Sequence, residues 1–260
     1  MGERALLEVE DLAVAARSRD GDTEIIHGVD LRLETGETVA VVGETGSGKS
    51  LTMLALMRLL TPPLAITRGR ILFEGVDLTG LAERRMRELR GSRIAMIYQD
   101  PLTSLNPLMR IGDQVAEAMV AHGVGSAEAR RRTLELLARV EMPDPERTAR
   151  AYPHEFSGGM RQRAVIAIAL AMRPKLLIAD EPTTALDVTV QQQIMALVDE
   201  LRRDLGMATI WVTHDLGVVA RLVDRVIVMY AGHVVEDAPG DQLFHAPQHP
   251  YTHSLLAALP

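Results

Sequence analysis

One octapeptide decides how the rest of the chain is interpreted: Gly43-Glu44-Thr45-Gly46-Ser47-Gly48-Lys49-Ser50. It fits the pattern G-x-x-x-x-G-K-[ST], in which glycines let consecutive backbone N–H groups point inward around phosphate groups. Residues 37–42 before it form a short apolar run typical of a strand, and residues 51–60 after it have the composition of a buried helix. The context predicts a phosphate-binding loop at the start of a helix, where the helix N-terminus adds partial positive charge.

Two side chains of this loop add chemistry to that of its backbone. We expect the Lys49 amine to reach the β- and γ-phosphates of ATP, and the Ser50 hydroxyl to bind Mg²⁺. The glycines and the side chains of one loop would thus hold a complete triphosphate. The whole of residues 43–50 is therefore the candidate site for ATP and Mg²⁺.

A second motif is an apolar run that ends in two carboxylates, Leu176-Leu177-Ile178-Ala179-Asp180-Glu181. A buried strand of this kind resembles the Walker B arrangement, so Asp180 is expected to hold Mg²⁺ directly or through water. Glu181 lies where a carboxylate can polarise a water for in-line attack on the γ-phosphate, the role of a general base. Strands that end in acidic residues are common, and this assignment gains its weight from the loop upstream. Together the two motifs predict ATP hydrolysis.

Composition limits the remaining classes of function. A chain of 260 residues has room for one large α/β domain, alone or with an inserted subdomain. It contains no cysteine, which excludes disulfides, thiolate metal sites and cysteine nucleophiles. The formal net charge of -7 disfavours nucleic acid as a partner. The longest apolar run, residues 164–172, falls short of the roughly 20 residues of a membrane span. Residues 1–11 carry four acidic side chains where a secretory signal would be basic and then apolar, which favours a cytoplasmic chain.

Hydrophobic periodicity gives the order of the elements. Alternating apolar residues predict strands early in the chain, and residues 100–152 have helical character without a convincing strand. We interpret that segment as an inserted helical subdomain, after which the α/β alternation resumes. The expected strands are residues 6–14, 25–33, 37–42, 176–179, 208–213, 226–229 and 233–236, and the expected helices are residues 51–60, 111–122, 127–140, 190–205 and one from 158.

Three histidines near the end of the chain recur at every fourth position, His245, His249 and His253. Such spacing could place metal ligands on one face of a helix. Pro247 and Pro250 interrupt any helix that would align them. We therefore expect a surface loop here.

A third motif supplies a resemblance to a known family, Phe156-Ser157-Gly158-Gly159-Met160-Arg161-Gln162-Arg163. Together with the two earlier motifs it resembles the signature of the ABC ATPase superfamily, whose usual form is L-S-G-G-Q. Phe156 and Met160 depart from that form, whereas Ser-Gly-Gly is kept and can bind a phosphate at a helix N-terminus. The residues alone also fit a simple helix capped by Ser157.

The resemblance extends over nearly the whole chain. Gln99 matches the family's Q-loop, Ala185-Leu186-Asp187 its D-loop, and His214 its switch histidine. The resemblance implies an α/β P-loop NTPase fold of the ABC type, with an N-terminal antiparallel β-subdomain and an inserted helical subdomain. The implied parts are a RecA-like core with the β-subdomain (1–99 and 153–238), the helical subdomain (100–152) and a short helical tail (239–260).

The family pattern also implies roles for site residues. Glu181, Gln99 and His214 would be catalytic, and Gln99 would also help to hold Mg²⁺. Two ATPase subunits would sandwich two ATP molecules, so that Ser157, Gly158, Gly159 and Asp187 of one subunit complete the site on the phosphate-binding loop of the other. ATP binding would close this dimer, and hydrolysis would open it.

A finer similarity is to the ATP-binding subunits of dipeptide and oligopeptide ABC importers. It rests on residues 98–107, residues 152–156, residues 180–189 and His249-Pro250-Tyr251-Thr252. This resemblance implies transmembrane permease subunits, a second ATPase subunit, an extracytoplasmic solute-binding protein and a peripheral place at the cytoplasmic face of the membrane. The family usually continues with a cysteine-bearing extension that is not in this sequence, which leaves importers of nickel or metallophores open.

Two alternatives of another class are soluble ABC ATPases in DNA maintenance and in regulation. The DNA enzymes carry a long coiled coil or a zinc-binding insertion, and this chain has neither heptads of that length nor cysteine. A regulator without a permease is left open by the sequence.

The adenine base lacks an obvious partner in the sequence. The family usually stacks an aromatic on adenine near position 16, but this chain has Ala16 followed by Arg17, and its first aromatic is Phe73. Arg17 or Arg19 could lie over the base, or both could be surface charges beside a turn. We expect phosphates and Mg²⁺ to supply most of the affinity.

Overall fold

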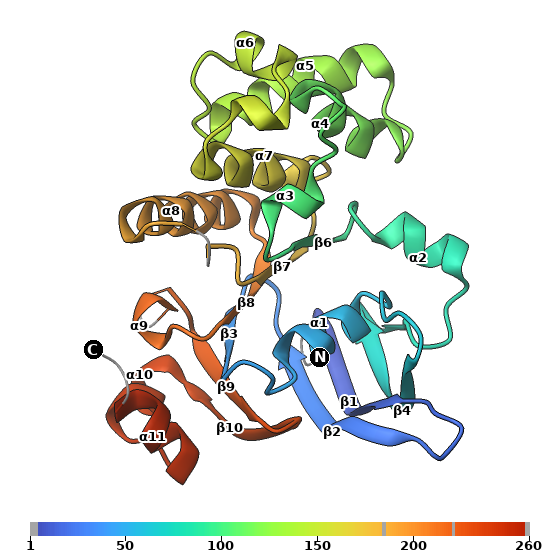
Figure 1. Cartoon of the computed structure of the whole chain (residues 1–260), viewed down its shortest axis with the longest axis vertical. Coiled ribbons are helices and arrows are strands. Elements are labelled where there is room, and N and C mark those ends of the chain that lie inside the picture. Colours follow the sequence, from blue (N-terminus) through green and yellow to red (C-terminus); the bar gives the residue numbers. More distant parts are fainter. Residues whose placement is uncertain (1–4, 184–185, 220–221, 258–260) are drawn as a thin grey trace. The chain divides into compact units, whose positions relative to one another are not determined.

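The computed structural model describes residues 5–183, 186–219 and 222–257 (Figure 1). The chain forms two compact units, and each has its own internal packing. The first combines residues 1–86 with residues 208–260, and the second comprises residues 87–207. The first unit is thus built from two segments that are far apart in the sequence.

The first unit contains a four-stranded antiparallel sheet in the order β2-β1-β4-β5 (Figure 1). Alternation predicted β1 and β2 correctly, since Val29, Leu31 and Leu33 on β2 are buried and the residues between them are exposed. β4 was not predicted from the sequence. Gly69 interrupts its pattern at a register shift, where a Cβ would lie 2.4 Å from the carbonyl oxygen of Asp11. The strands are β1 (Leu7–Ala16), β2 (Thr23–Leu33), β4 (Leu64–Phe73) and β5 (Val76–Asp77).

Parallel strands in the same unit position the phosphate-binding loop. The fully buried strand β3 (Thr38–Val42) lies between β8 (Ala208–Thr213) and β9 (Arg225–Tyr230), parallel to both, and β10 (His233–Pro239) pairs antiparallel with β9. Val42 on β3 is opposite Thr213 on β8. The loop after β3 and the residue after β8 therefore start from the same edge of the sheet.

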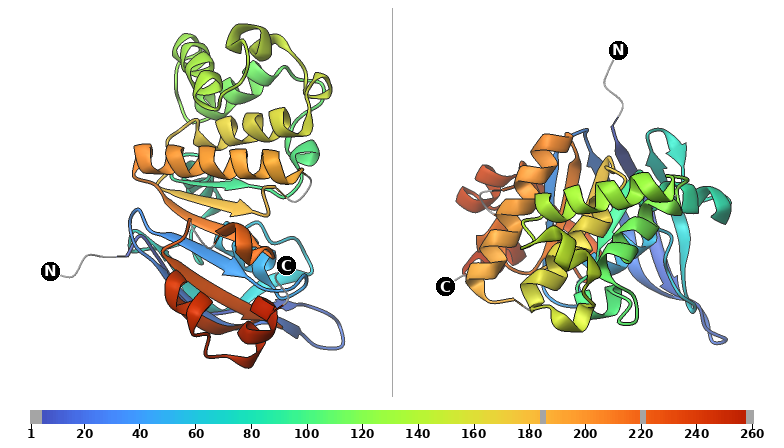
Figure 2. Two further views of the ribbon diagram at one scale, coloured as in Figure 1. Left: turned by 90° about the vertical axis from the view of Figure 1, so that its left-hand side faces the viewer. Right: turned by 90° about the horizontal axis from the view of Figure 1, so that it is seen from above.

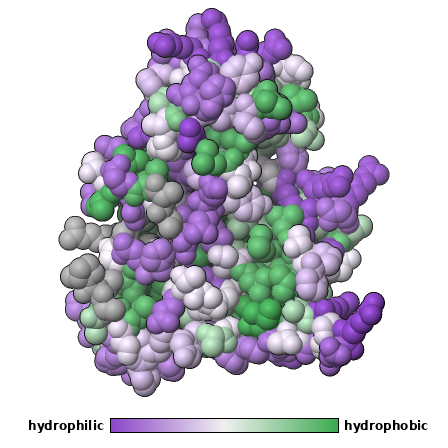
Figure 3. Space-filling model, in the orientation of Figure 1, coloured by the Kyte–Doolittle hydropathy of each residue, from purple (hydrophilic) through white to green (hydrophobic). Residues whose placement is uncertain are grey.

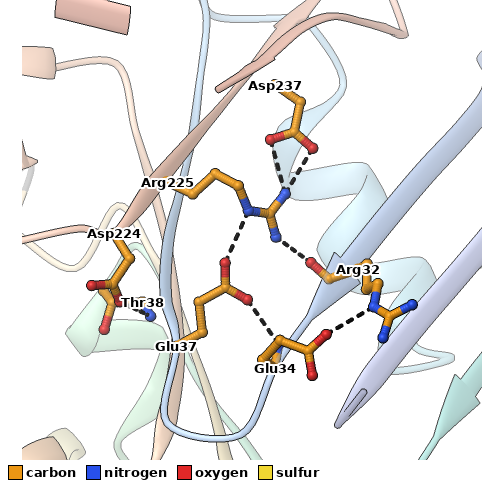
Figure 4. A network of polar contacts seen from close by, with 7 residues as sticks. All are labelled: Arg32, Glu34, Glu37, Thr38, Asp224, Arg225 and Asp237. Atoms are coloured by element: carbon orange, nitrogen blue, oxygen red, sulfur yellow. Dashed lines mark hydrogen bonds and ion pairs between the residues drawn. The ribbon is translucent and has the colours of Figure 1, made fainter. Parts of the chain in front are cut away.

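A polar network fixes the start of β3 (Figure 4). Arg225 donates from Nε to Glu37 Oε1 at 2.9 Å and from Nη1 to both carboxylate oxygens of Asp237 at 2.8 and 2.7 Å. The Thr38 N–H donates to Asp224 Oδ2 at 2.8 Å. Burial lowers the pKa of Arg225, but its hydrogen bonds and ion pairs with Glu37 and Asp237 outweigh burial and raise that pKa above its ordinary value. The strand that leads into the loop is thus held at its first residue.

The second unit pairs β6 (Ile94–Ile97) in parallel with β7 (Leu176–Asp180). Figure 2 shows α7 (Gly158–Leu170) and α8 (Val188–Leu205) side by side next to this pair, and α4, α5 and α7 contact one another. The helices predicted at 111–122 and 127–140 are confirmed as α4 and α5. The further helices of the unit are α3 (Pro101–Ser104), α4 (Ile111–Val120), α5 (Ser126–Arg139), α6 (Pro145–Arg150) and the 3-10 turn η1 (Pro153–Glu155).

The end of the first unit contains two short helices. α10 (Gly240–His245) includes His245, and α11 (Pro250–Ala257) includes His253, so the prediction of a loop was wrong for these two histidines. Pro250 begins α11 instead of breaking it, because the first turn of a helix needs no backbone N–H donor. The remaining helices are α1 (Lys49–Leu56), α2 (Glu83–Leu89) and α9 (Leu216–Val219). Within the described ranges, no helix has the length and apolar character of a membrane span.

Candidate active site

The phosphate-binding loop, residues 43–50, adopts a backbone that only glycine fits at two positions. Gly43 has φ +150°, and a Cβ there would lie 2.2 Å from the Met229 carbonyl oxygen. Gly48 has φ +102°, and its Cβ would lie 2.5 Å from Ile26 Cδ1. The loop is therefore packed directly on its neighbours, as a cradle built from backbone requires.

Lys49 is the first residue of α1 and is buried, with 4% of its surface exposed. Its Nζ donates to the carbonyl oxygens of Gly43 at 2.7 Å and of Glu44 at 2.9 Å. These contacts compensate in part for burying the ammonium group. They also hold one positive charge against the loop at a helix N-terminus, which is the environment that a phosphate group needs.

In the second unit, the carboxylates predicted from the sequence lie at the end of β7. Asp180 is its last residue and is buried, and Glu181 follows with φ 45°. This left-handed backbone turns the chain sharply at the general-base candidate, a kind of strain that concentrates at functional sites. The pairing of Ile97 with Ala179 brings the segment after β6 to the same edge, and Gln99 Nε2 donates to Glu181 Oε2 at 3.1 Å.

The Ser-Gly-Gly motif begins α7, also in the second unit. The predicted cap is confirmed, because Ser157 Oγ accepts from the Met160 N–H at 3.3 Å. A Cβ on Gly158 would lie 3.2 Å from Leu186 Cδ2, and one on Gly159 would lie 2.9 Å from Val190 Cγ1. The two glycines thus allow this helix start to pack closely on the residues that follow β7.

The other predicted site residues are placed within their own units. Asp187 caps α8, since its Oδ1 accepts from the Val190 N–H at 3.0 Å. Ala185, which belongs to the same motif, and Thr184 lie outside the described residues. His214 is exposed directly after β8, at the sheet edge from which the phosphate-binding loop also starts. The first unit therefore places residues 43–50 and His214 at one edge of its sheet, and the second joins Gln99 to Glu181 by a hydrogen bond.

One contact at the phosphate-binding loop was not predicted as such. The Glu44 N–H donates to the Tyr251 hydroxyl at 2.9 Å, although the two residues are 207 positions apart. In the sequence, Tyr251 belongs to the importer-like motif His249-Pro250-Tyr251-Thr252, which does not indicate a contact with the phosphate-binding loop. No local pattern indicates that α11 returns to the loop.

The fold and these motifs define a P-loop ATPase. Its phosphate-binding loop follows a buried parallel strand and opens a helix, and a second buried strand ends in the expected carboxylates. A protein-family model for ABC transporters matches residues 26–184. The chain belongs to the ABC transporter family and is an ABC-type ATPase.

Relatives of known name support this membership. The chain is 54% identical to the oligopeptide transport ATP-binding protein OppD of Bacillus subtilis over 98% of its own length and 72% of that protein. It is 50% identical to the dipeptide transport ATP-binding protein DppD of Lactococcus lactis over 100% of its length and 75% of that protein. It is 51% identical to the oligopeptide transport ATP-binding protein OppD of Salmonella typhimurium over 98% of its length and 76% of that protein.

Solved structures share the fold. The ATP-binding cassette MJ0796, as a dimer in a post-hydrolysis state with ADP and phosphate, superposes with a TM-score of 0.79 at 27% identity, covering 90% of this chain and 98% of that one. The cbiO1 protein of Clostridium perfringens, part of the transporter complex cbiONQ, gives a TM-score of 0.79 at 30% identity, with coverages of 94% and 92%. These likenesses confirm the predicted ABC cassette fold with its antiparallel β-subdomain and helical subdomain.

We predict weak discrimination between nucleotide bases. Ala16 ends β1, and Arg17 and Arg19 beyond it are exposed. Stacking on an aromatic would be worth roughly 1–3 kcal/mol by analogy with nucleic-acid sites, and this region offers none. GTP and CTP should therefore compete with ATP for turnover at fixed Mg²⁺. A preference for ATP above about fiftyfold, roughly 2.3 kcal/mol, would mean that another group contacts the base.

Proposed function

We propose that this chain binds Mg²⁺-ATP and hydrolyses it to energise the import of dipeptides or oligopeptides through partner permease subunits. The observation that carries the proposal is the 54% identity to an oligopeptide transport ATP-binding protein over 98% of this chain. The contacts of Lys49, Gln99 and Glu181 support the hydrolytic part of it.

Each site residue has a proposed role. The backbone N–H groups of the phosphate-binding loop and the Lys49 amine hold the β- and γ-phosphates. Ser50, Asp180 and Gln99 are the proposed Mg²⁺ ligands, and their oxygens are of the type that this hard cation prefers. When bound, Mg²⁺ neutralises phosphate charge. Glu181 orients and deprotonates the attacking water, and Gln99 positions Glu181 through their hydrogen bond. His214 is the third proposed catalytic residue, on the γ-phosphate side of the site.

A second ATPase subunit completes the proposed site. Ser157, Gly158, Gly159 and Asp187 of one subunit would face the nucleotide on the phosphate-binding loop of its partner. Ser157 already begins a helix of 13 residues whose N-terminal amides suit a phosphate. Closure on ATP and opening after hydrolysis would then drive the permease.

The proposed permease contact lies on the second unit. Three exposed apolar side chains follow β6, with Tyr98 38%, Leu102 60% and Leu108 86% exposed. Hydrophobic surface is visible around α3 and α4 (Figure 3). Large apolar side chains exposed in one short segment are typical of an interaction surface. We place the permease contact on this segment, next in sequence to Gln99, and an extracytoplasmic solute-binding protein would deliver the cargo.

Co-purification tests the transporter assignment. A tagged chain isolated from detergent-solubilised membranes should bring its permease subunits with it, at near-equal stoichiometry, as mass spectrometry can show. A variant with Leu102 and Leu108 replaced by Ser should recover less permease at unchanged yield, and a Val76→Ser variant, at an exposed apolar side chain of the first unit, serves as the control. Recovery of the chain alone from membranes and cytoplasm would favour a regulator without a permease.

A further inference from the structure

The segment that leads into α11 is anchored by one buried carboxylate. Glu236 on β10 is 9% exposed and accepts from the N–H groups of Gln248 at 2.8 Å and His249 at 2.9 Å, one on each oxygen. Burial raises the pKa of Glu236, but the hydrogen bonds that it accepts outweigh burial and lower that pKa below its usual range. The carboxylate therefore stays ionised at neutral pH and fixes the two residues that precede α11.

This anchor directs Tyr251 towards the phosphate-binding loop. Its hydroxyl accepts from the Glu44 N–H at 2.9 Å, and its ring packs on that of Tyr230 with centroids 4.5 Å apart at 45°. Burial raises the pKa of Tyr251, so the phenol is neutral at neutral pH. Ring packing and anchor together hold the hydroxyl at a fixed place beside the loop.

The hydrogen bond to Tyr251 and one bond to Lys49 involve the same peptide group. The carbonyl of Gly43 accepts from Lys49 Nζ at 2.7 Å, and the N–H of Glu44 in that same planar unit donates to Tyr251. Rotation of this peptide would break both bonds at once. We propose that Tyr251 is a positioning residue that fixes the Gly43–Glu44 peptide and, through it, the amine of Lys49 for nucleotide binding.

This inference rests on the proposed binding of nucleotide by the phosphate-binding loop and is independent of the transported solute. Replacing Tyr251 by Phe keeps the ring and removes the acceptor. A typical net hydrogen bond then predicts a dissociation constant for Mg²⁺-ADP about two- to tenfold higher. Tyr230→Phe removes a hydroxyl from the neighbouring ring and should leave ADP affinity unchanged.

A double-mutant cycle separates positioning from general loosening of the fold. Equilibrium titration of the full chain with Mg²⁺-ADP is made for wild type, Tyr251→Phe, Lys49→Met and the double variant. If Tyr251 acts through Lys49, its substitution should change affinity less than about twofold in the Lys49→Met background, because coupled residues are not additive. The melting temperature of nucleotide-free Tyr251→Phe should lie within about 4 °C of that of the Tyr230→Phe control, the shift that the loss of one hydrogen bond produces in an intact fold.

Three results would overturn the inference: unchanged ADP affinity in Tyr251→Phe, an equal loss in both backgrounds, or the same loss in Tyr230→Phe. Absence of ADP binding by the wild-type chain would overturn the inference together with the proposed function. Normal binding by wild type with any of the first three results would leave the proposed function standing.

Discussion

Glu181→Gln should bind ATP and hydrolyse it about 10²- to 10⁴-fold more slowly than the wild type, the usual contribution of a general base. The amide keeps the size of the side chain and removes the group that deprotonates the attacking water. Gln99 donates to Glu181 Oε2, and an amide oxygen at this place can still accept that bond, so the local geometry should survive. The measurement is phosphate release at saturating Mg²⁺-ATP.

Glu200→Gln is the matched control for this prediction. Glu200 is exposed on α8 in the same unit, so the same chemical change there should leave turnover near the wild-type value. ATP-bound dimers of Glu181→Gln should accumulate and can be detected by size-exclusion chromatography. Retention of more than about a tenth of wild-type turnover would exclude Glu181 as the base.

Lys49→Ala should lose nucleotide affinity as well as turnover. Hydrogen bonds from charged groups contribute about 1.5–3 kcal/mol, which predicts ATP binding weaker by about 10- to 150-fold. Lys49 is buried, so Lys49→Met, which retains most of the side-chain volume, should show the same loss with a smaller change in melting temperature. Unchanged affinity in both variants, measured by equilibrium titration, would contradict the assigned role.

Ser157→Arg should fail in a different way. Its phosphate-binding loop is intact, so the monomer should bind ATP normally, whereas the bulky cation at the start of α7 should prevent closure of the dimer. Where subunits exchange and homodimerise, mixing it with Lys49→Ala combines one intact loop with one intact signature in a single composite site. Some turnover should return. Mixed dimers that form and stay inactive would count against a shared site.

Local patterns predicted most of the elements around the site. The strand and helix that flank the phosphate-binding loop, β7 with its carboxylates and the cap at Ser157 each depend on neighbouring residues, and the structure contains them as β3, α1, β7 and α7. β6 was not predicted from the sequence. Its four residues are too few for periodicity to separate a strand from a buried helix segment.

Contacts between residues that are distant in the sequence could not be predicted from the sequence patterns. The bond between Gln99 and Glu181 depends on the register of β6 with β7, and the bond between Glu44 and Tyr251 depends on the path of the chain after β10. No property of residues 245–253 alone reveals that Glu236 will bind their backbone and start α11 there. Register and long-range hydrogen bonds are set by tertiary packing, which a single sequence does not report.

Solute uptake by the reconstituted transporter tests the central claim most directly. Permease subunits co-purified with this chain are inserted in vesicles, with the chain facing the side that receives Mg²⁺-ATP, and uptake of a labelled tripeptide is followed in the presence of the solute-binding protein. The account predicts peptide uptake that requires ATP and is abolished by Glu181→Gln. Peptide uptake that is unaffected by this substitution, or ATP-driven uptake of nickel or a metallophore in place of peptide, would contradict it.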